Sequence, residues 1–200
     1  MDEIRDIARK LFAYEPHLYP EDIWDETLEA RIDRLKPEEL DVIDGNKSYA
    51  MAVKSGLYLW NQSLDKSHTL SQGIHHATGS YWHGIMHRME GDYSNSKYWF
   101  HRVGDHPIFS ELHSRARQLL RDMRSSEPVR HKRVNALLDQ LEESSRWQPY
   151  VMIDCVELQV TMARDERAEA ILRAVQRLEL VLLLEYSYAQ SFGGSLFDAV

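Results

Sequence analysis

The sequence contains a single cysteine, Cys155, in 200 residues. One cysteine excludes an intrachain disulfide framework and a cysteine-based zinc finger, because both need several thiols. Cys155 also lies in an apolar run, which predicts an inert buried thiol and not a nucleophile. A soluble protein of a reducing, cytoplasmic compartment is therefore expected.

Long apolar runs are missing as well. The longest strongly apolar run, Leu180–Leu184, is far shorter than the roughly 20 residues that a membrane-spanning helix needs. The N-terminus is charged from its second residue and has no apolar segment typical of a signal peptide. The sequence therefore predicts no membrane segment and no secretion signal.

Positively charged residues are fewer than negatively charged ones: 24 Lys and Arg stand against 32 Asp and Glu. The net charge is −8 and the pI is near 5.7. A chain this acidic repels a phosphate backbone, and no basic stripe is visible, so nucleic-acid binding is not expected. Hydrophobic residues make up 43% of the chain, which is enough for a substantial core. The length suits one domain over residues 1–200.

Apolar residues recur at helical spacing, interrupted by Gly and Pro, and no alternating strand pattern is found. This pattern predicts an all-α fold, a single-domain helical bundle of about seven to nine helices. Residues 1–45 are the most acidic part and are expected to form an arm or cap over a main bundle at 46–192. Within 1–45, helices are expected in 1–15, in 21–35 and between Pro37 and Gly45. The later helices are expected at 48–72, 80–91, 92–104, 107–123, 131–146, 149–163 and 166–190.

Residues 80–107 have the pattern of a helical hairpin. Gly84, Ser96 and Phe100 fall where tetratricopeptide hairpins place two small residues and an aromatic one. Only one copy is present, and about three are needed for a stable solenoid, so the pattern predicts close helix packing only. Ser80 and Asp92 are the expected N-caps of the two helices.

Three strings in the middle of the chain resemble an uncharacterised family of small all-helical proteins. They are SHTLSQ at 67–72, GSYWHGIMHR at 79–88 and GDYSNSKYWF at 91–100. The stretches 147–157 and 176–188 are similar too, so the resemblance covers about residues 50–190. The family has no known activity, and the resemblance implies one helical domain without assigning any catalytic role.

Eight of the ten histidines lie between His68 and His113, although this segment is less than a quarter of the chain. Histidine is the usual acid or base near neutral pH and a common metal ligand. His83, His87 and Glu90 have i, i+4 and i+7 spacing, which places them on one helix face. This set predicts a site for a divalent metal such as zinc.

The metal-site pattern is incomplete, and two other interpretations stay open. In the zincin motif a glutamate directly follows the first histidine, but here Gly84 follows His83. The face could instead be exposed and polar, or the histidines could stack among Trp82, Trp99 and Tyr98. His68 continues the apolar stripe of residues 53–64 and is expected to point inward, either as a satisfied core histidine or beside His83 and His87.

Carboxylates in apolar surroundings of the C-terminal half are the candidate opposite wall of a site. Asp154 and Glu157 are three residues apart in an apolar run, and Glu185 extends the apolar stripe of the last helix. A buried carboxylate needs a partner, so we expect these acids to face the histidine-rich segment. The candidate counter-charges are Arg88, Lys97 and Arg102. The alternative is a solvated strip for Asp154 and Glu157 and a helix rim for Glu185.

Two functions from different classes follow from these patterns. The first is a small-molecule or metal-binding pocket that could catalyse proton transfer or metal-assisted hydrolysis. Its candidate catalytic residues are His68, His83 and His87, and its candidate substrate-binding residues are Arg88, Asp154, Glu157 and Glu185. The second is a protein–protein interaction module or homo-oligomer, in which Trp60, Trp82 and Trp99 would be exposed anchors.

Overall fold

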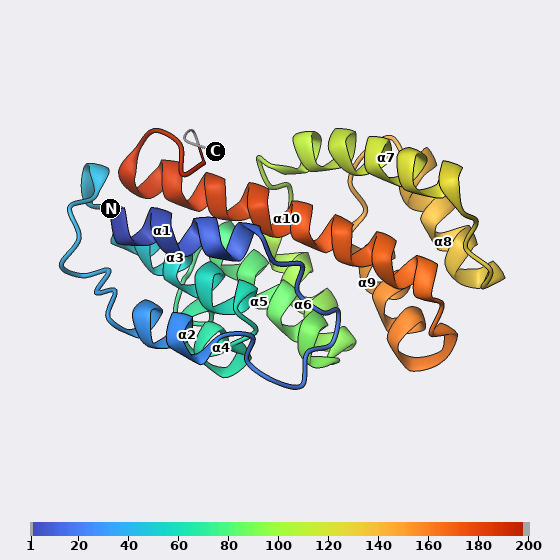
Figure 1. The fold of residues 1–200 in the computed structure, drawn as a ribbon. Helices are drawn as coiled ribbons and strands as arrows, with labels where there is room; N and C mark the ends of the chain where they lie inside the picture. The colour runs from blue at the N-terminus through green and yellow to red at the C-terminus, as the bar shows by residue number, and fades with distance from the viewer. Residues whose placement is uncertain (1, 198–200) are drawn as a thin grey trace.

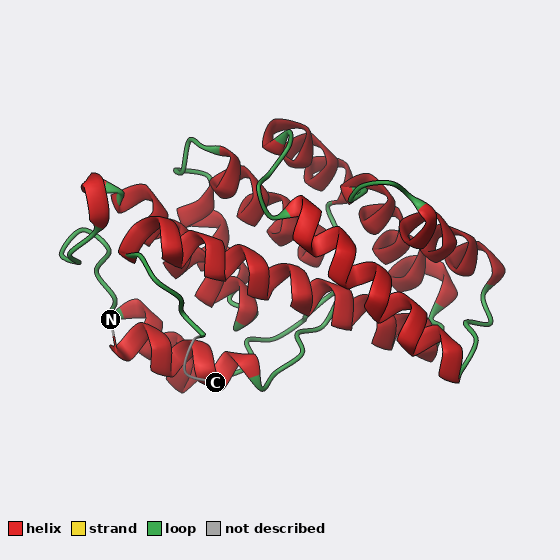
Figure 2. Cartoon of the chain, turned by 90° about the horizontal axis from the view of Figure 1, so that it is seen from above, coloured by secondary structure: helices red, strands yellow, loops and turns green. Residues whose placement is uncertain are grey.

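The periodic apolar residues form helices throughout the computed structural model, which describes residues 2–197 (Figures 1 and 2). Within this range all regular elements are helical, which confirms the all-α bundle predicted from sequence. None of these helices is long and apolar enough to cross a membrane. The helices are α1 (Asp2–Phe12), α2 (Glu26–Asp33), α3 (Lys47–Trp60), α4 (Leu64–Ser71), α5 (Ala77–Glu90), α6 (Tyr93–Val103), α7 (Phe109–Ser126), α8 (Lys132–Glu143), α9 (Pro149–Leu158) and α10 (Glu166–Phe192).

The last helix, α10, runs along the molecule and packs against both α3 and α7 (Figure 1). Asp165 caps its N-terminus, as its side chain accepts hydrogen bonds from the backbone N–H groups of Arg167 and Ala168, each at 3.0 Å. The preceding helix α9 continues into a π turn at Gln159–Ala163. The chain therefore stays helical over almost the whole of residues 149–192.

The α5–α6 hairpin packs as the small residues predict. A Cβ atom on Gly84 would lie only 2.8 Å from Phe100, and the Ser96 hydroxyl donates to the Gly84 carbonyl over 2.7 Å. Asp92 caps α6 as expected. The predicted cap at Ser80 is wrong, because α5 begins three residues earlier, where the His76 imidazole accepts from the Gly79 N–H.

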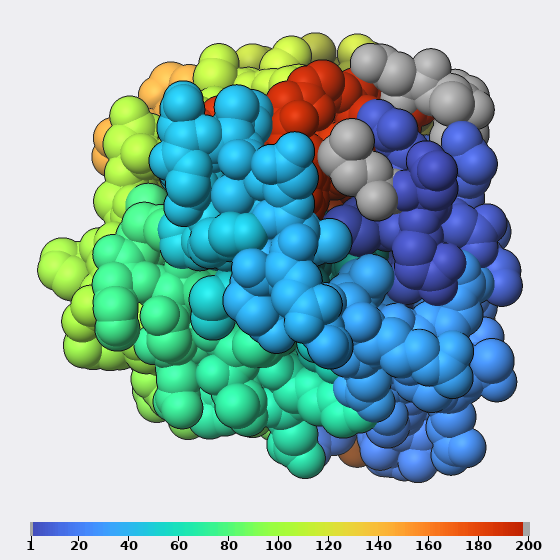
Figure 3. All heavy atoms as spheres, turned by 90° about the vertical axis from the view of Figure 1, so that its left-hand side faces the viewer, coloured from blue at the N-terminus to red at the C-terminus, as the bar shows by residue number. Residues whose placement is uncertain are grey.

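The acidic N-terminal residues cover one end of the bundle, beside the C-terminal part of the chain (Figure 3). Ile4, Ile7 and Leu11 on α1 are buried in the common core. Arg5 donates to the Ser195 carbonyl at 3.3 Å, which ties the two ends of the chain together. The helix expected between Pro37 and Gly45 is reduced to a single 3₁₀ turn at Ile43–Gly45.

The helix expected at 48–72 is broken in two. It ends at Trp60 and restarts at Leu64, because Gln62 adopts the left-handed conformation with φ of 62°. The Gln62 amide is fixed by distant partners: its oxygen accepts from the Tyr14 hydroxyl and the His17 N–H, each at 2.9 Å. These long-range bonds hold a turn that helical periodicity alone does not predict.

The close approach at Gly84 can be tested with a double-mutant cycle. Gly84→Ala places a methyl group against Phe100, so we expect a net loss of roughly 1–3 kcal/mol in unfolding free energy despite the better helix propensity of Ala. In a Phe100→Leu background the same change should cost less, because the smaller side chain leaves room. Urea unfolding measures both values, and equal costs in the two backgrounds would contradict the contact.

Candidate metal centre

Three histidines from two helices come together at the junction of α4 and α5. His68 lies on α4, and His83 and His87 lie one turn apart on α5, which packs against α4. One ring nitrogen from each lies within 4.8 Å of the others. The ring centroids are 4.6 Å apart for His83 and His87, and His68 meets them edge-on at 4.7 and 5.3 Å. We call these three residues the histidine cluster.

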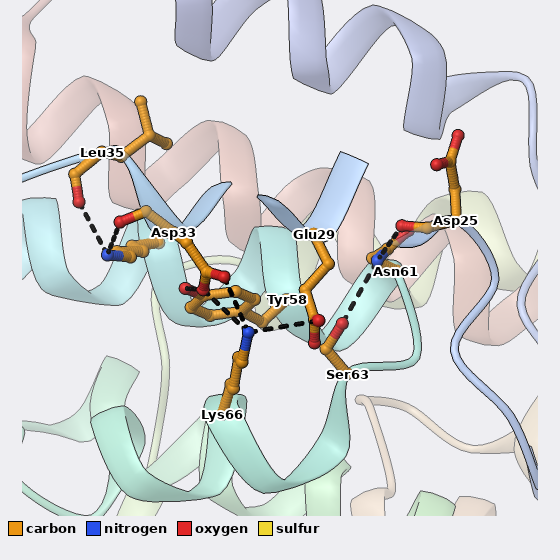
Figure 4. A network of polar contacts seen from close by, with 9 residues as sticks. Asp25, Glu29, Asp33, Leu35, Tyr58, Asn61, Ser63 and Lys66 are labelled. Atoms are coloured by element: carbon orange, nitrogen blue, oxygen red, sulfur yellow. Dashed lines mark hydrogen bonds and ion pairs between the residues drawn. The ribbon is translucent and has the colours of Figure 1, made fainter. Parts of the chain in front are cut away.

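Polar contacts on α2 and α3 hold α4 in place (Figure 4). The Lys66 ammonium donates to both Asp33 carboxylate oxygens at 2.8 and 2.9 Å and lies 3.1 Å from Glu29 on α2. On the α3 side, the Ser55 hydroxyl donates to the Ser67 carbonyl at 3.1 Å. His68 is half-buried and meets the other two histidines because α4 is a separate helix, not because it continues the stripe of α3.

His83 is the most enclosed member of the cluster. Its side chain is 1% exposed and stacks on Trp99, with ring centroids 4.0 Å apart and an interplanar angle of 16°. Burial, together with His87 and His68, lowers the pKa of His83 to about 3, so the imidazole is neutral at pH 7. Its Nδ1 atom is buried without a hydrogen-bond partner, which typically costs about 1–3 kcal/mol.

His87 is held through both of its ring nitrogens. Nδ1 lies within hydrogen-bond distance of Glu90 Oε1, and Nε2 lies 3.0 Å from the Asn95 amide nitrogen. A carboxylate on one nitrogen of an imidazole orients the ring and makes the other nitrogen a better metal ligand. Of the predicted set His83, His87 and Glu90, the two histidines join His68, while Glu90 lies exposed beside His87.

Arg88 lies in the core, where Glu179 of α10 is its partner. Its Nη2 atom is 2.5 Å from Glu179 Oε2 and 3.3 Å from Gln176 Oε1, and both charged side chains are fully buried. The Tyr81 hydroxyl donates to the other Glu179 oxygen at 2.8 Å, and burial raises the pKa of Tyr81. Sequence analysis missed Glu179, although a charged residue between Leu178 and Leu180 on a mostly apolar helix marks a buried carboxylate.

The other acids predicted from sequence have partners outside the histidine cluster. Lys97, one of the predicted counter-charges, lies 2.6 Å from Asp154 and 3.9 Å from Glu157, and both carboxylates are nearly half exposed. Glu185 is half-buried and accepts from the Leu196 N–H at 3.0 Å, so it has the expected hydrogen-bond partner but is less buried than predicted. These contacts place Asp154 and Glu157 on the outer face of α6 and α9.

The tryptophans are not arranged as the exposed anchors of an interaction module. Trp60 and Trp82 are fully buried, and their indole N–H groups donate to the Tyr14 carbonyl at 3.1 Å and the Ser187 hydroxyl at 3.2 Å. Trp99 is half-buried against His83. Burial also raises the pKa of the Cys155 thiol, in agreement with the inert thiol predicted from sequence.

No family model, curated protein or solved structure matches this chain. The family resemblance of residues 50–190 therefore stays an expectation. The geometry and chemistry of the histidine cluster are the basis on which a function can be proposed.

Because His83 is neutral in the folded protein, the stability of the protein should decrease at acidic pH. Its folded pKa of about 3 is below the value of about 6.5 in an unfolded chain, so between these values the unfolded state binds more protons. We expect the free energy of unfolding to fall as pH decreases from about 6.5 toward 3, and His83→Asn to flatten this dependence. Urea unfolding across this pH range measures both effects.

The matched control is His75→Asn, which changes an exposed histidine. His106, whose pKa burial lowers to about 4, is present in every variant and cancels in the difference between wild type and His83→Asn. If the difference in unfolding free energy between wild type and His83→Asn does not vary with pH, the result would contradict a buried neutral His83.

The buried pair of Arg88 and Glu179 predicts a large loss when one partner is removed. Arg88→Met leaves the Glu179 carboxylate without its cation, so we expect a loss of about 3–5 kcal/mol in unfolding free energy. The double variant Arg88→Met/Glu179→Leu should lose less, because no charge is left unpaired. Lys97→Met is the exposed control, expected to cost about 0–1 kcal/mol. A small effect of Arg88→Met would contradict the pair.

Proposed function

We propose that His68, His83 and His87 bind a divalent metal ion, with Zn²⁺ as the ion that suits them best. The observation that carries this proposal is the buried, unpartnered Nδ1 of neutral His83 inside a cluster of three imidazoles. Three tetrahedral ligands at about 2.0–2.1 Å from zinc lie about 3.3 Å from one another. Ligand atoms already within 4.8 Å reach that spacing by small side-chain rotations.

The surrounding side chains have distinct roles in this proposal. Trp99 holds the His83 ring by stacking, and Glu90 fixes the His87 ring through Nδ1. The Asn95 amide, now 3.0 Å from His87 Nε2, has to turn away when that nitrogen binds an ion. The half-buried His68 completes the set from α4.

Three protein ligands support a catalytic and not a purely structural metal site. Structural zinc sites use four protein ligands, whereas catalytic sites use three and leave one position for water. A bound zinc ion would lower the pKa of such a water to about 7 and so supply a nucleophile for hydrolysis. We therefore propose metal-assisted hydrolysis of a small molecule as the activity of the histidine cluster.

Metal content tests the site directly. We expect the wild type to retain about one Zn²⁺ per chain after dialysis against limiting zinc, and His83→Ala/His87→Ala to retain almost none, because two of three ligands are lost. Elemental analysis and calorimetric titration measure the stoichiometry and the affinity. The matched control is His75→Ala/His101→Ala, which removes two exposed histidines.

Two results would contradict the proposal. The first is a wild type that binds no divalent ion although its circular dichroism shows a folded helical protein. The second is stoichiometric zinc that persists in His83→Ala/His87→Ala, which would place the ion elsewhere.

A further inference from the structure

A second group of potential ligands adjoins the histidine cluster on its exposed side. His87, Glu90 and Asp92 each offer one ligand atom, and these atoms also lie within 4.8 Å of one another. His87 belongs to both groups. Unlike His83 and His87, which are 1% and 4% exposed, Glu90 and Asp92 are exposed to solvent.

The contacts of these side chains leave ligand atoms free to meet a cation. Asp92 uses Oδ1 to cap α6, where it accepts from the Asn95 N–H and the Ser94 hydroxyl, each at 3.1 Å, which leaves Oδ2. Glu90 uses Oε1 toward His87 Nδ1, which leaves Oε2. An arriving ion could bind these two free oxygen atoms beside the His87 ring, while Nδ1 stays bonded to Glu90.

We propose that His87, Glu90 and Asp92 form a loading position, through which a divalent ion reaches the histidine cluster. The inference rests on the proposed metal binding of that cluster. Two exposed carboxylates attract cations and raise their local concentration, and their oxygen atoms are ligands for an incoming hydrated ion. The three imidazoles hold a borderline ion such as Zn²⁺ or Co²⁺ more strongly, so the ion moves inward past the ring of His87 to the histidine cluster.

A loading position has a kinetic signature that differs from that of a permanent ligand. Because ions enter and leave by the same route, removal of its charges slows association and dissociation together and leaves the dissociation constant nearly unchanged. Loss of a ligand from the final site instead speeds dissociation and weakens binding. The two roles can therefore be separated with one variant.

The test variant is Asp92→Asn, which leaves the contact of Glu90 with His87 in place. Asn is as good an N-cap as Asp, so the local structure is preserved. Stopped-flow mixing with Co²⁺ measures the rates through quenching of tryptophan fluorescence, since Trp99 stacks on His83. We expect both rates to fall roughly fivefold, while the dissociation constant changes by less than about twofold.

The matched control is Asp65→Asn, which removes an exposed carboxylate from α4, three residues before His68. Unchanged rates in Asp92→Asn would overturn the loading position, and so would faster dissociation with weaker binding. The loading position would also be overturned if association slowed in the control Asp65→Asn and not in the test variant, because ions would then arrive along α4. If the wild type binds no Co²⁺ or Zn²⁺, the proposed function itself fails. If the wild type binds the ion tightly but the test variant has unchanged rates, only the loading position fails.

Discussion

The ion pair between Arg88 and Glu179 joins α5 to α10, and α5 is also enclosed by α3, α4, α6 and α9. Polar side chains on such a helix must find partners inside the protein, and a buried charge pair is tolerated only with good geometry. The pair fixes the rotation of α5 about its axis. Since Arg88 lies about 100° around the helix from His87, this rotation also directs His87 and His83 toward α4.

The same enclosure depends on glycine. A Cβ on Gly56 would lie 2.5 Å from the Trp82 ring, just as one on Gly84 would meet Phe100 at 2.8 Å, so α3 and α6 both approach α5 closely. This close packing excludes water from the interior face of α5. The exclusion of water explains why His83 remains neutral, and a neutral imidazole is the form that binds a metal.

Local features of the sequence could be predicted, and features that depend on distant residues could not. Helical spacing placed His83 and His87 on one face, and Asp92 was identified as a cap from neighbouring residues alone. The break at Gln62 depends on bonds to residues 14–22, which no local pattern reveals. Sequence analysis offered Arg88 as a counter-charge for Asp154, Glu157 and Glu185. Its partner in the structure is Glu179, which lies 91 residues away on α10, so no local pattern reveals the pair.

The two helices of the histidine cluster are held in different ways, and this difference bears on metal binding. His83 and His87 lie on a helix fixed by the core, whereas the ion pairs of Lys66 that hold α4 are largely exposed. Exposed ion pairs contribute little stability, so the Lys66 pairs hold α4 less firmly than the core holds α5. An ion bound only by the folded state would offset the cost of the unpartnered His83 nitrogen. In the proposed metal site, His68 is therefore the ligand that would adjust, while His83 and His87 would stay in place.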